Sequence, residues 1–231
     1  MSAVISLTAI IPIIFLTEPN TQNKKESQEE ISLIQNLRDL PRNYYQFLFV
    51  SLLFGLANFT ILLFIYHART VIFEVMGSTP PLFQIGFTIS LFIWFNIIYT
   101  VLSTPFGSWS DKYGRKIIFS IGLVLFIITC LIFLLTTNFY VLLIAFGVYG
   151  AFNAATDGIQ KAFTVDLLPP HLKGTGIGLL QTITGFAGIL GGMIAGLLYD
   201  IDFSLTFLYG ALTALIALIL FIPMRLASEE S

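Results

Sequence analysis

The sequence predicts an all-α integral membrane protein with six full transmembrane helices and one shorter apolar segment at its N-terminus. Hydrophobic residues make up 56% of the 231 residues, and Asp, Glu, Lys and Arg together make up 10%. A soluble globular protein carries roughly 25% charged residues, because most of its surface must be wet. The mean hydropathy of +0.89 also excludes a disordered chain. A net charge of −2 without a basic stripe argues against nucleic-acid binding.

Long apolar runs are the second observation behind this fold class. Each run is close to the ~20 residues that a helix needs to cross ~30 Å of hydrocarbon. Asp157, Lys161 and Lys173 are the only charged residues inside the runs, and each lies toward one end. Barrel strands would alternate apolar and polar residues, whereas these runs are apolar on every face, so helices are predicted. The runs lie at residues 44–66, 82–104, 117–136, 139–161, 173–198 and 203–224.

The remaining segments complete the predicted organisation. Residues 1–17 are apolar and lack both a basic start and an Ala-x-Ala-like cleavage site, so a short transmembrane segment is predicted rather than a signal peptide. Residues 18–43 are polar, with apolar residues recurring at the spacing of an amphipathic helix; a solvated linker without a stable helix is the alternative. We expect residues 44–226 to form one helical bundle and residues 227–231 to form a tail.

The distribution of Lys and Arg predicts the orientation in the membrane. When the connections alternate between two sides, ten of the 11 basic residues fall on one side and only Arg69 on the other. Basic loops remain in the cytoplasm. We therefore expect a multi-pass protein of the plasma membrane whose linker at 18–43, charged short loops and C-terminus are cytoplasmic. The ten residues are Lys24, Lys25, Arg38, Arg42, Lys112, Arg115, Lys116, Lys161, Lys173 and Arg225.

The charged connection after the second full span carries the most specific motif. Residues 107–116 follow the pattern G-x-x-x-D-[RK]-x-G-R-[RK], which resembles the signature loop of the major facilitator superfamily of secondary transporters. We expect Gly107 to allow close helix packing and Gly114 to form a tight turn at positive φ. An arginine in this loop can bind a carboxylate with two parallel hydrogen bonds. The matching residues are Gly107, Asp111, Lys112, Gly114, Arg115 and Lys116.

A second stretch is similar to the connection between the fourth and fifth helices of a facilitator half. Asp157 and Lys161 close one span, and the pattern D-x-x-P-x-x-x-K-G-T at residues 166–175 opens the next. The resemblance implies that the bundle corresponds to the C-terminal six-helix half of such a transporter. Residues 1–17 would then be the tail of a sixth helix, and residues 18–43 the linker between the halves.

The resemblance also implies a function, namely transport of a small solute by alternating access, driven by an ion or solute gradient. The residues leave the substrate open among drugs, sugars, organic acids and amino acids. Because facilitators hold their substrate between two halves, three alternatives remain: a truncated sequence, a half that pairs with a separate N-terminal half, or a homodimer. The rival class is a non-transporting membrane protein, either an assembly partner or an inert relic.

Polar residues inside the spans are the candidate functional residues, because a polar group that faces lipid is costly. Asn58, Asn153 and Gln181 are candidate substrate-cavity residues, with helix–helix hydrogen bonding as the alternative. The family resemblance favours Asn58 and Asn153, because it places the first and fourth helices of this half around the central cavity.

A charged cluster is predicted at the cytoplasmic face. We expect Asp111, Arg115, Asp157 and Lys161 to form a gate network, with Arg115 contacting Asp157 and Asp111 facing a neighbouring helix start. Lys161 would complete the cluster. The intact network would hold the cytoplasmic side closed.

A glycine stripe and several missing motifs complete the sequence-based expectations. Gly188, Gly192 and Gly196 repeat every four residues, a spacing that predicts close packing of one helix face against another. The sequence contains no catalytic triad, phosphate-binding loop or metal-ligand cluster. We therefore expect neither enzymatic activity nor a cofactor, and the expected partners are membrane lipid and a small-molecule substrate.

Overall fold

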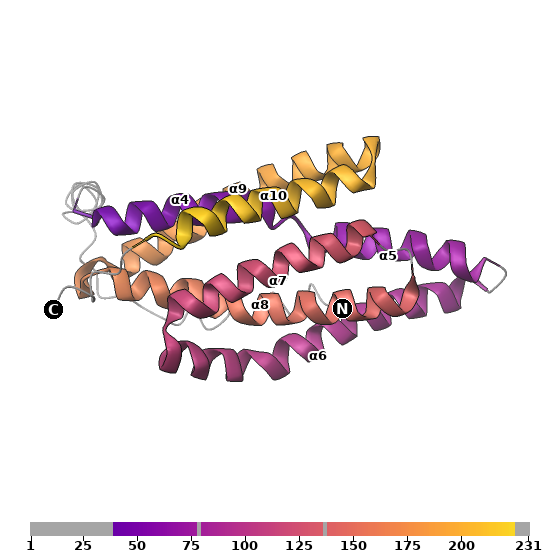
Figure 1. Cartoon of the computed structure of the whole chain (residues 1–231), viewed down its shortest axis with the longest axis horizontal. Helices are drawn as coiled ribbons and strands as arrows, with labels where there is room; N and C mark the ends of the chain where they lie inside the picture. Colours follow the sequence, from indigo (N-terminus) through magenta and orange to yellow (C-terminus); the bar gives the residue numbers. More distant parts are fainter. Residues whose placement is uncertain (1–38, 78–79, 136–137, 225–231) are drawn as a thin grey trace, which may run out of the picture. The chain divides into compact units, whose positions relative to one another are not determined.

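The computed structural model describes residues 39–77, 80–135 and 138–224 (Figure 1). The predictions for residues 1–17, for most of the linker and for the tail at 227–231 lie outside this part of the chain. The described residues contain helices and no strands, and six helical spans are long and apolar enough to cross a membrane. The helices are α4 (Arg42–Ala57), α5 (Ile61–Met76), α6 (Pro81–Tyr113), α7 (Arg115–Leu135), α8 (Phe139–Leu167), the 3₁₀ turn η1 (Pro170–Leu172), α9 (Lys173–Ile201) and α10 (Phe203–Phe221). The prediction of an all-α membrane bundle is confirmed.

The first span is broken, although the sequence predicted one continuous helix over residues 44–66. The break lies between α4 and α5, at residues 58–60. The backbone N–H of Asn58 donates to the Phe54 carbonyl at 2.8 Å, where α4 ends. The side chain of Thr60 then caps α5 by accepting from the Leu62 N–H at 3.3 Å. Asn and Thr favour such local bonds with the backbone, so they interrupt an otherwise apolar helix.

The helix α6 extends well past the apolar run that predicted it. It begins at Pro81, where the missing N–H of proline costs nothing because the first turn has no acceptor for it. It ends at Tyr113, so most of the signature loop is helical. Gly114 alone separates α6 from α7, with φ at 97° and its N–H donating to the Ser110 carbonyl at 3.0 Å. Only glycine adopts this backbone region readily, so Gly114 forms the predicted tight turn.

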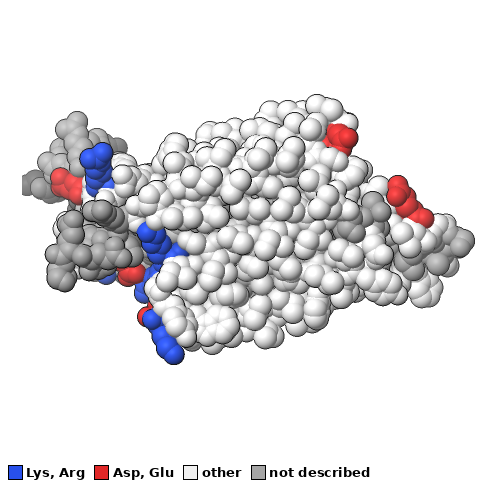
Figure 2. Space-filling model, in the orientation of Figure 1, with Lys and Arg blue, Asp and Glu red and all other residues white. Residues whose placement is uncertain are grey.

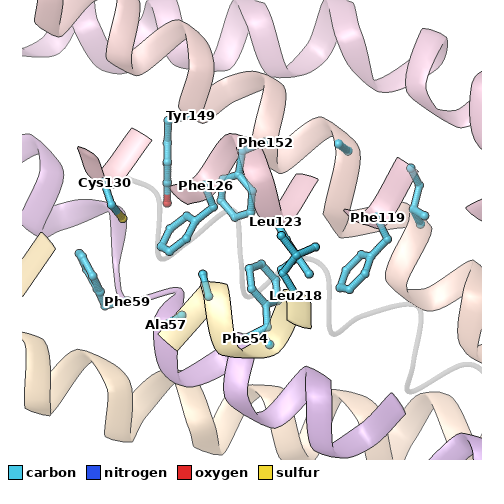
Figure 3. Packing of buried hydrophobic residues seen from close by; sticks show 14 of the residues in the cluster. Phe54, Ala57, Phe59, Phe119, Leu123, Phe126, Cys130, Tyr149, Phe152 and Leu218 are labelled. Atoms are coloured by element: carbon cyan, nitrogen blue, oxygen red, sulfur yellow. The ribbon is translucent and has the colours of Figure 1, made fainter. Parts of the chain in front are cut away.

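Buried phenylalanine rings join the helices of the bundle. The helix α8 packs against α6 and α7, and α10 packs against α7 and α4. Figure 3 shows Phe54 of α4 beside Phe126 of α7 and Phe152 of α8. Their ring centroids lie 4.9 Å apart for Phe126 and Phe152 and 5.8 Å apart for Phe54 and Phe152. Tilted and edge-to-face ring pairs of this kind fill the core without sizeable voids.

The helices α4 and α9 approach each other through glycines, but not through the predicted ones. A Cβ added to Gly191 would collide with the Leu56 carbonyl oxygen, and a Cβ added to Gly55 would lie 2.8 Å from the Ala187 Cβ. The Leu56 carbonyl, near the end of α4, also accepts a hydrogen bond from the Tyr209 hydroxyl at 3.0 Å. This contact holds the broken span in place.

The glycine stripe predicted to pack is open in the described structure. A Cβ added at Gly188, Gly192 or Gly196 would meet no atom within 4 Å. The face of α9 that meets α4 carries Gly191 instead, one residue away from Gly192 and therefore about 100° around the helix. Within the described residues the stripe therefore makes no close contact, and its packing against another body stays a prediction.

Candidate functional site

Basic side chains gather at one end of the bundle. Figure 2 shows Lys and Arg at the end where α4 begins and α6 meets α7, while the surface between the two ends carries neither acidic nor basic residues on this face. The turn at Gly114, the start of α9 and the end of α10 lie at this same end. We call it the charged end. Its composition matches the side that the sequence assigns to the cytoplasm.

Arg115 connects three helices at the charged end. Its guanidinium lies 2.7 Å from the Asp166 carboxylate on α8 and 3.6 Å from the Asp111 carboxylate on α6. It also donates to the Ala162 carbonyl at 2.5 Å. Charge-assisted bonds to carboxylates are the strong ones, and the planar guanidinium can serve several acceptors at once.

The partners of Arg115 differ in part from the expected ones. Asp166, and not Asp157, is the α8 carboxylate that faces the guanidinium, whereas Asp111 pairs with Arg115 at the start of the neighbouring helix α7, as expected. The reason is the axial level: Asp166 lies nine residues beyond Asp157 on α8, about 13 Å further along the helix. Asp166 is the first residue of the D-x-x-P-x-x-x-K-G-T pattern at residues 166–175. That pattern was therefore the sequence feature that pointed to Asp166 as a functional residue.

Three other residues of the signature loop, Gly107, Lys112 and Lys116, have different surroundings. A Cβ added at Gly107 would meet no atom within 4 Å, so the close packing expected of this glycine is absent among the described residues. Lys116, which the sequence assigned only a topological role, donates from Nζ to the Met224 carbonyl at 2.5 Å. This bond ties the start of α7 to the residues that follow α10. Lys112 lies over the Tyr113 ring, 5.3 Å from its centroid.

Asp157 of α8 lies between two polar pockets. The first pocket, about 450 Å³, is lined by residues of the signature loop, including Asp111 and Arg115, and by Asn153. The second pocket, about 280 Å³, lies between α4, α8 and α9 and also contains Lys161. Asp157 is the one residue that lines both, and its Oδ2 accepts a hydrogen bond from the Tyr99 hydroxyl at 3.2 Å. The contribution of Tyr99 was not predicted from the sequence.

The second pocket, which we call the polar pocket, brings together two of the three predicted cavity residues. Asn58, at the break after α4, and Gln181 on α9 both line it. Asn153 lines the other pocket, where its side-chain amide donates to the Tyr149 carbonyl of its own helix at 2.9 Å. Six of the nine residues that line the polar pocket are polar: Asn58, Asp157, Gln160, Lys161, Gln181 and Thr184.

Other hollows offer less chemistry. A hollow of about 810 Å³ lies between the start of α4 and the end of α10, near the first and the last residues that the structure describes, and none of the predicted cavity residues lines it. A hollow on α6 is lined by apolar side chains such as Leu82 and Phe87. Among the described residues, no group of three or more His, Cys, Asp or Glu side chains could hold a metal ion.

A bundle of six apolar helical spans with a polar pocket in one face and a charged turn at one end defines a multi-pass helical membrane protein. The profile described as Major Facilitator Superfamily matches residues 70–230. The chain belongs to the major facilitator superfamily.

Relatives with known names support this assignment. The chain is 34% identical over 225 residues to the uncharacterized MFS-type transporter MJ1317 of Methanocaldococcus jannaschii, across 96% of this chain and 54% of the relative. It is 27% identical over 125 residues to the quinolone resistance protein NorA of Staphylococcus aureus, across 54% of this chain and 32% of the relative. The chain therefore spans about half the length of MJ1317 and a third of NorA.

Proposed function

We propose that this protein moves a small solute across a membrane by alternating access, with its six-helix bundle as one wall of the substrate cavity. The polar pocket is the observation that carries the proposal. Asp157, Lys161 and Gln181 are exposed on the bundle although they lie in helices that cross the membrane. Charged and amide side chains are too costly to face lipid, so this face requires water or protein beside it.

The burial of the helices supports a second wall on the same side. In the most apolar stretches of α6 and of the span containing α9, 17% of the residues are buried, against 33% to 50% in the other four spans. A helix has such low burial within its own bundle when its exposed side packs against a further protein half or subunit. The second wall would come from the other half of a longer chain, from a separate N-terminal half or from a second copy of this chain, in keeping with the half-length match to MJ1317.

The proposal also includes the orientation of the bundle and its location in the plasma membrane. We place the charged end, with Arg115 and Asp166, in the cytoplasm of a plasma-membrane protein, because basic loops stay on the cytoplasmic side. The ion pairs of Arg115 would then lie at the cytoplasmic mouth of the cavity. Rearrangement of such pairs is one of the ways in which packed helices switch between two states. The name of NorA makes drug export one candidate activity, alongside transport of polar metabolites.

Cysteine labelling tests alternating access without knowledge of the substrate. Gln181→Cys places a thiol in the polar pocket, while the native Cys130 is buried and does not compete for the reagent. An impermeant maleimide should label Gln181→Cys in right-side-out and in inside-out vesicles, because the pocket opens to each side in turn. The matched control is Ile219→Cys, on an exposed apolar face of α10, which should react from neither side.

Two results would contradict the proposed transport. Labelling of Gln181→Cys from one side alone would mean that the pocket never opens to the other side, as expected for a non-transporting membrane protein. Two-sided labelling in vesicles that also leak ions would mean an open channel rather than alternating access. Ion permeability of the same vesicles should therefore be measured with the labelling.

A further inference from the structure

The polar pocket carries two opposite charges, Asp157 and Lys161, that attract each other across one helical turn without forming a close ion pair. Asp157 and Lys161 are four residues apart on α8, so both lie on one face of the helix, with Cβ atoms about 5–6 Å apart. The ion pairs of the described residues join Arg115 to Asp111 and to Asp166, and neither Asp157 nor Lys161 takes part in one. Both side chains are exposed to the pocket face of the bundle.

The surroundings leave Asp157 available to a ligand. Arg115 of α7 lines the other pocket that Asp157 borders, and its guanidinium is already bound by the carboxylates of Asp111 and Asp166. Asp157 keeps one hydrogen bond, from the Tyr99 hydroxyl to Oδ2. A carboxylate offers about four lone-pair sites, so most of its accepting capacity remains. A carboxylate at this depth is costly unless a counter-charge lies beside it.

The rest of the pocket is suited to a small and polar molecule. Amides at Asn58, Gln160 and Gln181 supply both donors and acceptors, and Phe54 is the one aromatic lining residue. The Gln160 amide nitrogen is buried and has no hydrogen-bond partner among the described residues. The volume of about 280 Å³ lies just below the range of about 300–1,000 Å³ that is typical of ligand pockets. Such a lining does not provide the apolar surface that a large hydrophobic ligand requires.

We propose that the polar pocket selects small zwitterions, with Asp157 binding the cationic group of the solute and Lys161 binding its anionic group. Amino acids and short peptides have this chemistry. The proposal rests on the proposed transport function and names its substrate class. A zwitterion offers a partner to both charges of the pocket at once, whereas a cation or an anion alone offers a partner to only one of them.

Binding of three matched probes tests the charge requirement. L-Alanine carries both charges, L-alaninamide carries only the positive one, and propionate carries only the negative one. Saturation-transfer NMR on the purified chain in nanodiscs detects weak binding of each. Both charged residues belong to this chain, so we expect alanine to bind about 10- to 100-fold more tightly than either analogue, the effect of one hydrogen bond to a charged group.

Charge variants assign each group to its residue. Asp157→Asn should reduce the affinity for alanine to that for propionate, and Lys161→Gln should reduce it to that for alaninamide. The double variant Asp157→Lys, Lys161→Asp should restore the preference for alanine. Asp200→Asn, at the exposed end of α9 away from the pocket, is the control that should change nothing. Unchanged thermal midpoints verify that each variant is folded, and the probe comparison on the unaltered chain needs no variant.

Three results would overturn the substrate class: equal binding of the three probes, no binding of alanine, or a preference that Asp157→Asn and Lys161→Gln leave unchanged. Equal binding would mean that Asp157 and Lys161 neutralise each other in solution. If Gln181→Cys is still labelled from both sides in these cases, transport stands and only the zwitterion assignment fails. One-sided labelling refutes the transport function itself.

Discussion

Gly191→Ala should destabilise the bundle, whereas Gly192→Ala should not. A Cβ at Gly191 would overlap the carbonyl oxygen of Leu56 and lie 2.9 Å from its carbonyl carbon and its Cα. These are backbone atoms, so relief requires a shift of α4 as a whole rather than a rotamer change. Overpacking a filled interface costs about 1–3 kcal/mol in the free energy of unfolding.

Gly192→Ala is the control that separates the effect of the α4–α9 contact from the effect of helix propensity. Both glycines lie inside α9, so replacement by alanine gains the same propensity, up to about 1 kcal/mol. At Gly192 nothing lies within 4 Å of the added Cβ, so only this gain remains. The free energies of unfolding of the two variants should therefore differ by about 1–3 kcal/mol, the overpacking cost alone.

Unfolding of the purified chain in mixed micelles, followed by helical circular dichroism as SDS is added, measures this difference. Gly191→Ala should unfold at a lower SDS fraction than the unaltered chain, and Gly192→Ala at the same or a higher fraction. Equal midpoints for the two variants would refute the assigned α4–α9 contact. A lower midpoint for Gly192→Ala would instead show that the open stripe packs against something in the isolated chain.

Two further predictions concern the charged end. In double-mutant cycles on unfolding, Arg115 should couple more strongly to Asp166 than to Asp111, by up to about 1 kcal/mol, because the ion pair with Asp166 is shorter and less exposed; equal couplings would contradict the geometry of the Arg115 cluster. An impermeant thiol reagent should label a cysteine at Lys112 only from the cytoplasmic side and one at Gly77 only from outside, since the basic loops determine orientation; labelling of the Lys112 position in intact cells would reverse the topology.

The segments that form membrane-spanning helices could be predicted from the sequence, because the length and polarity of an apolar run suffice to identify a span. The turn at Gly114 was also predictable, since few residues adopt positive φ. The break at residues 58–60 was not predictable, because one Asn and one Thr in an apolar run occur in continuous helices as well. Whether they interrupt the helix depends on tertiary partners such as the hydrogen bond from Tyr209 to Leu56.

The residues that belong to the candidate site could be predicted from the sequence better than the contacts between them. Asn58 and Gln181 were singled out because amides are costly in lipid, and the structure brings them to one pocket. Pairing across helices depends on their relative axial shift, which sequence spacing does not contain. Arg115 therefore meets Asp166 rather than Asp157. The same limit applies to Gly191, because the rotation of α9 about its own axis decides which glycines meet α4.

The phenylalanine core determines which route a permeating molecule could follow. Rings such as Phe126 and Phe152 are fully buried and fill the space between α4, α7 and α8 (Figure 3). The axis of the described bundle is thus closed to water, and leakage through it would require these rings to leave their packed positions. In the proposed transport function, the permeating solute would follow the flank of the bundle, past the polar pocket. A competitive blocker would therefore have to bind along that flank, and shortening a core ring would reduce stability without opening a pore.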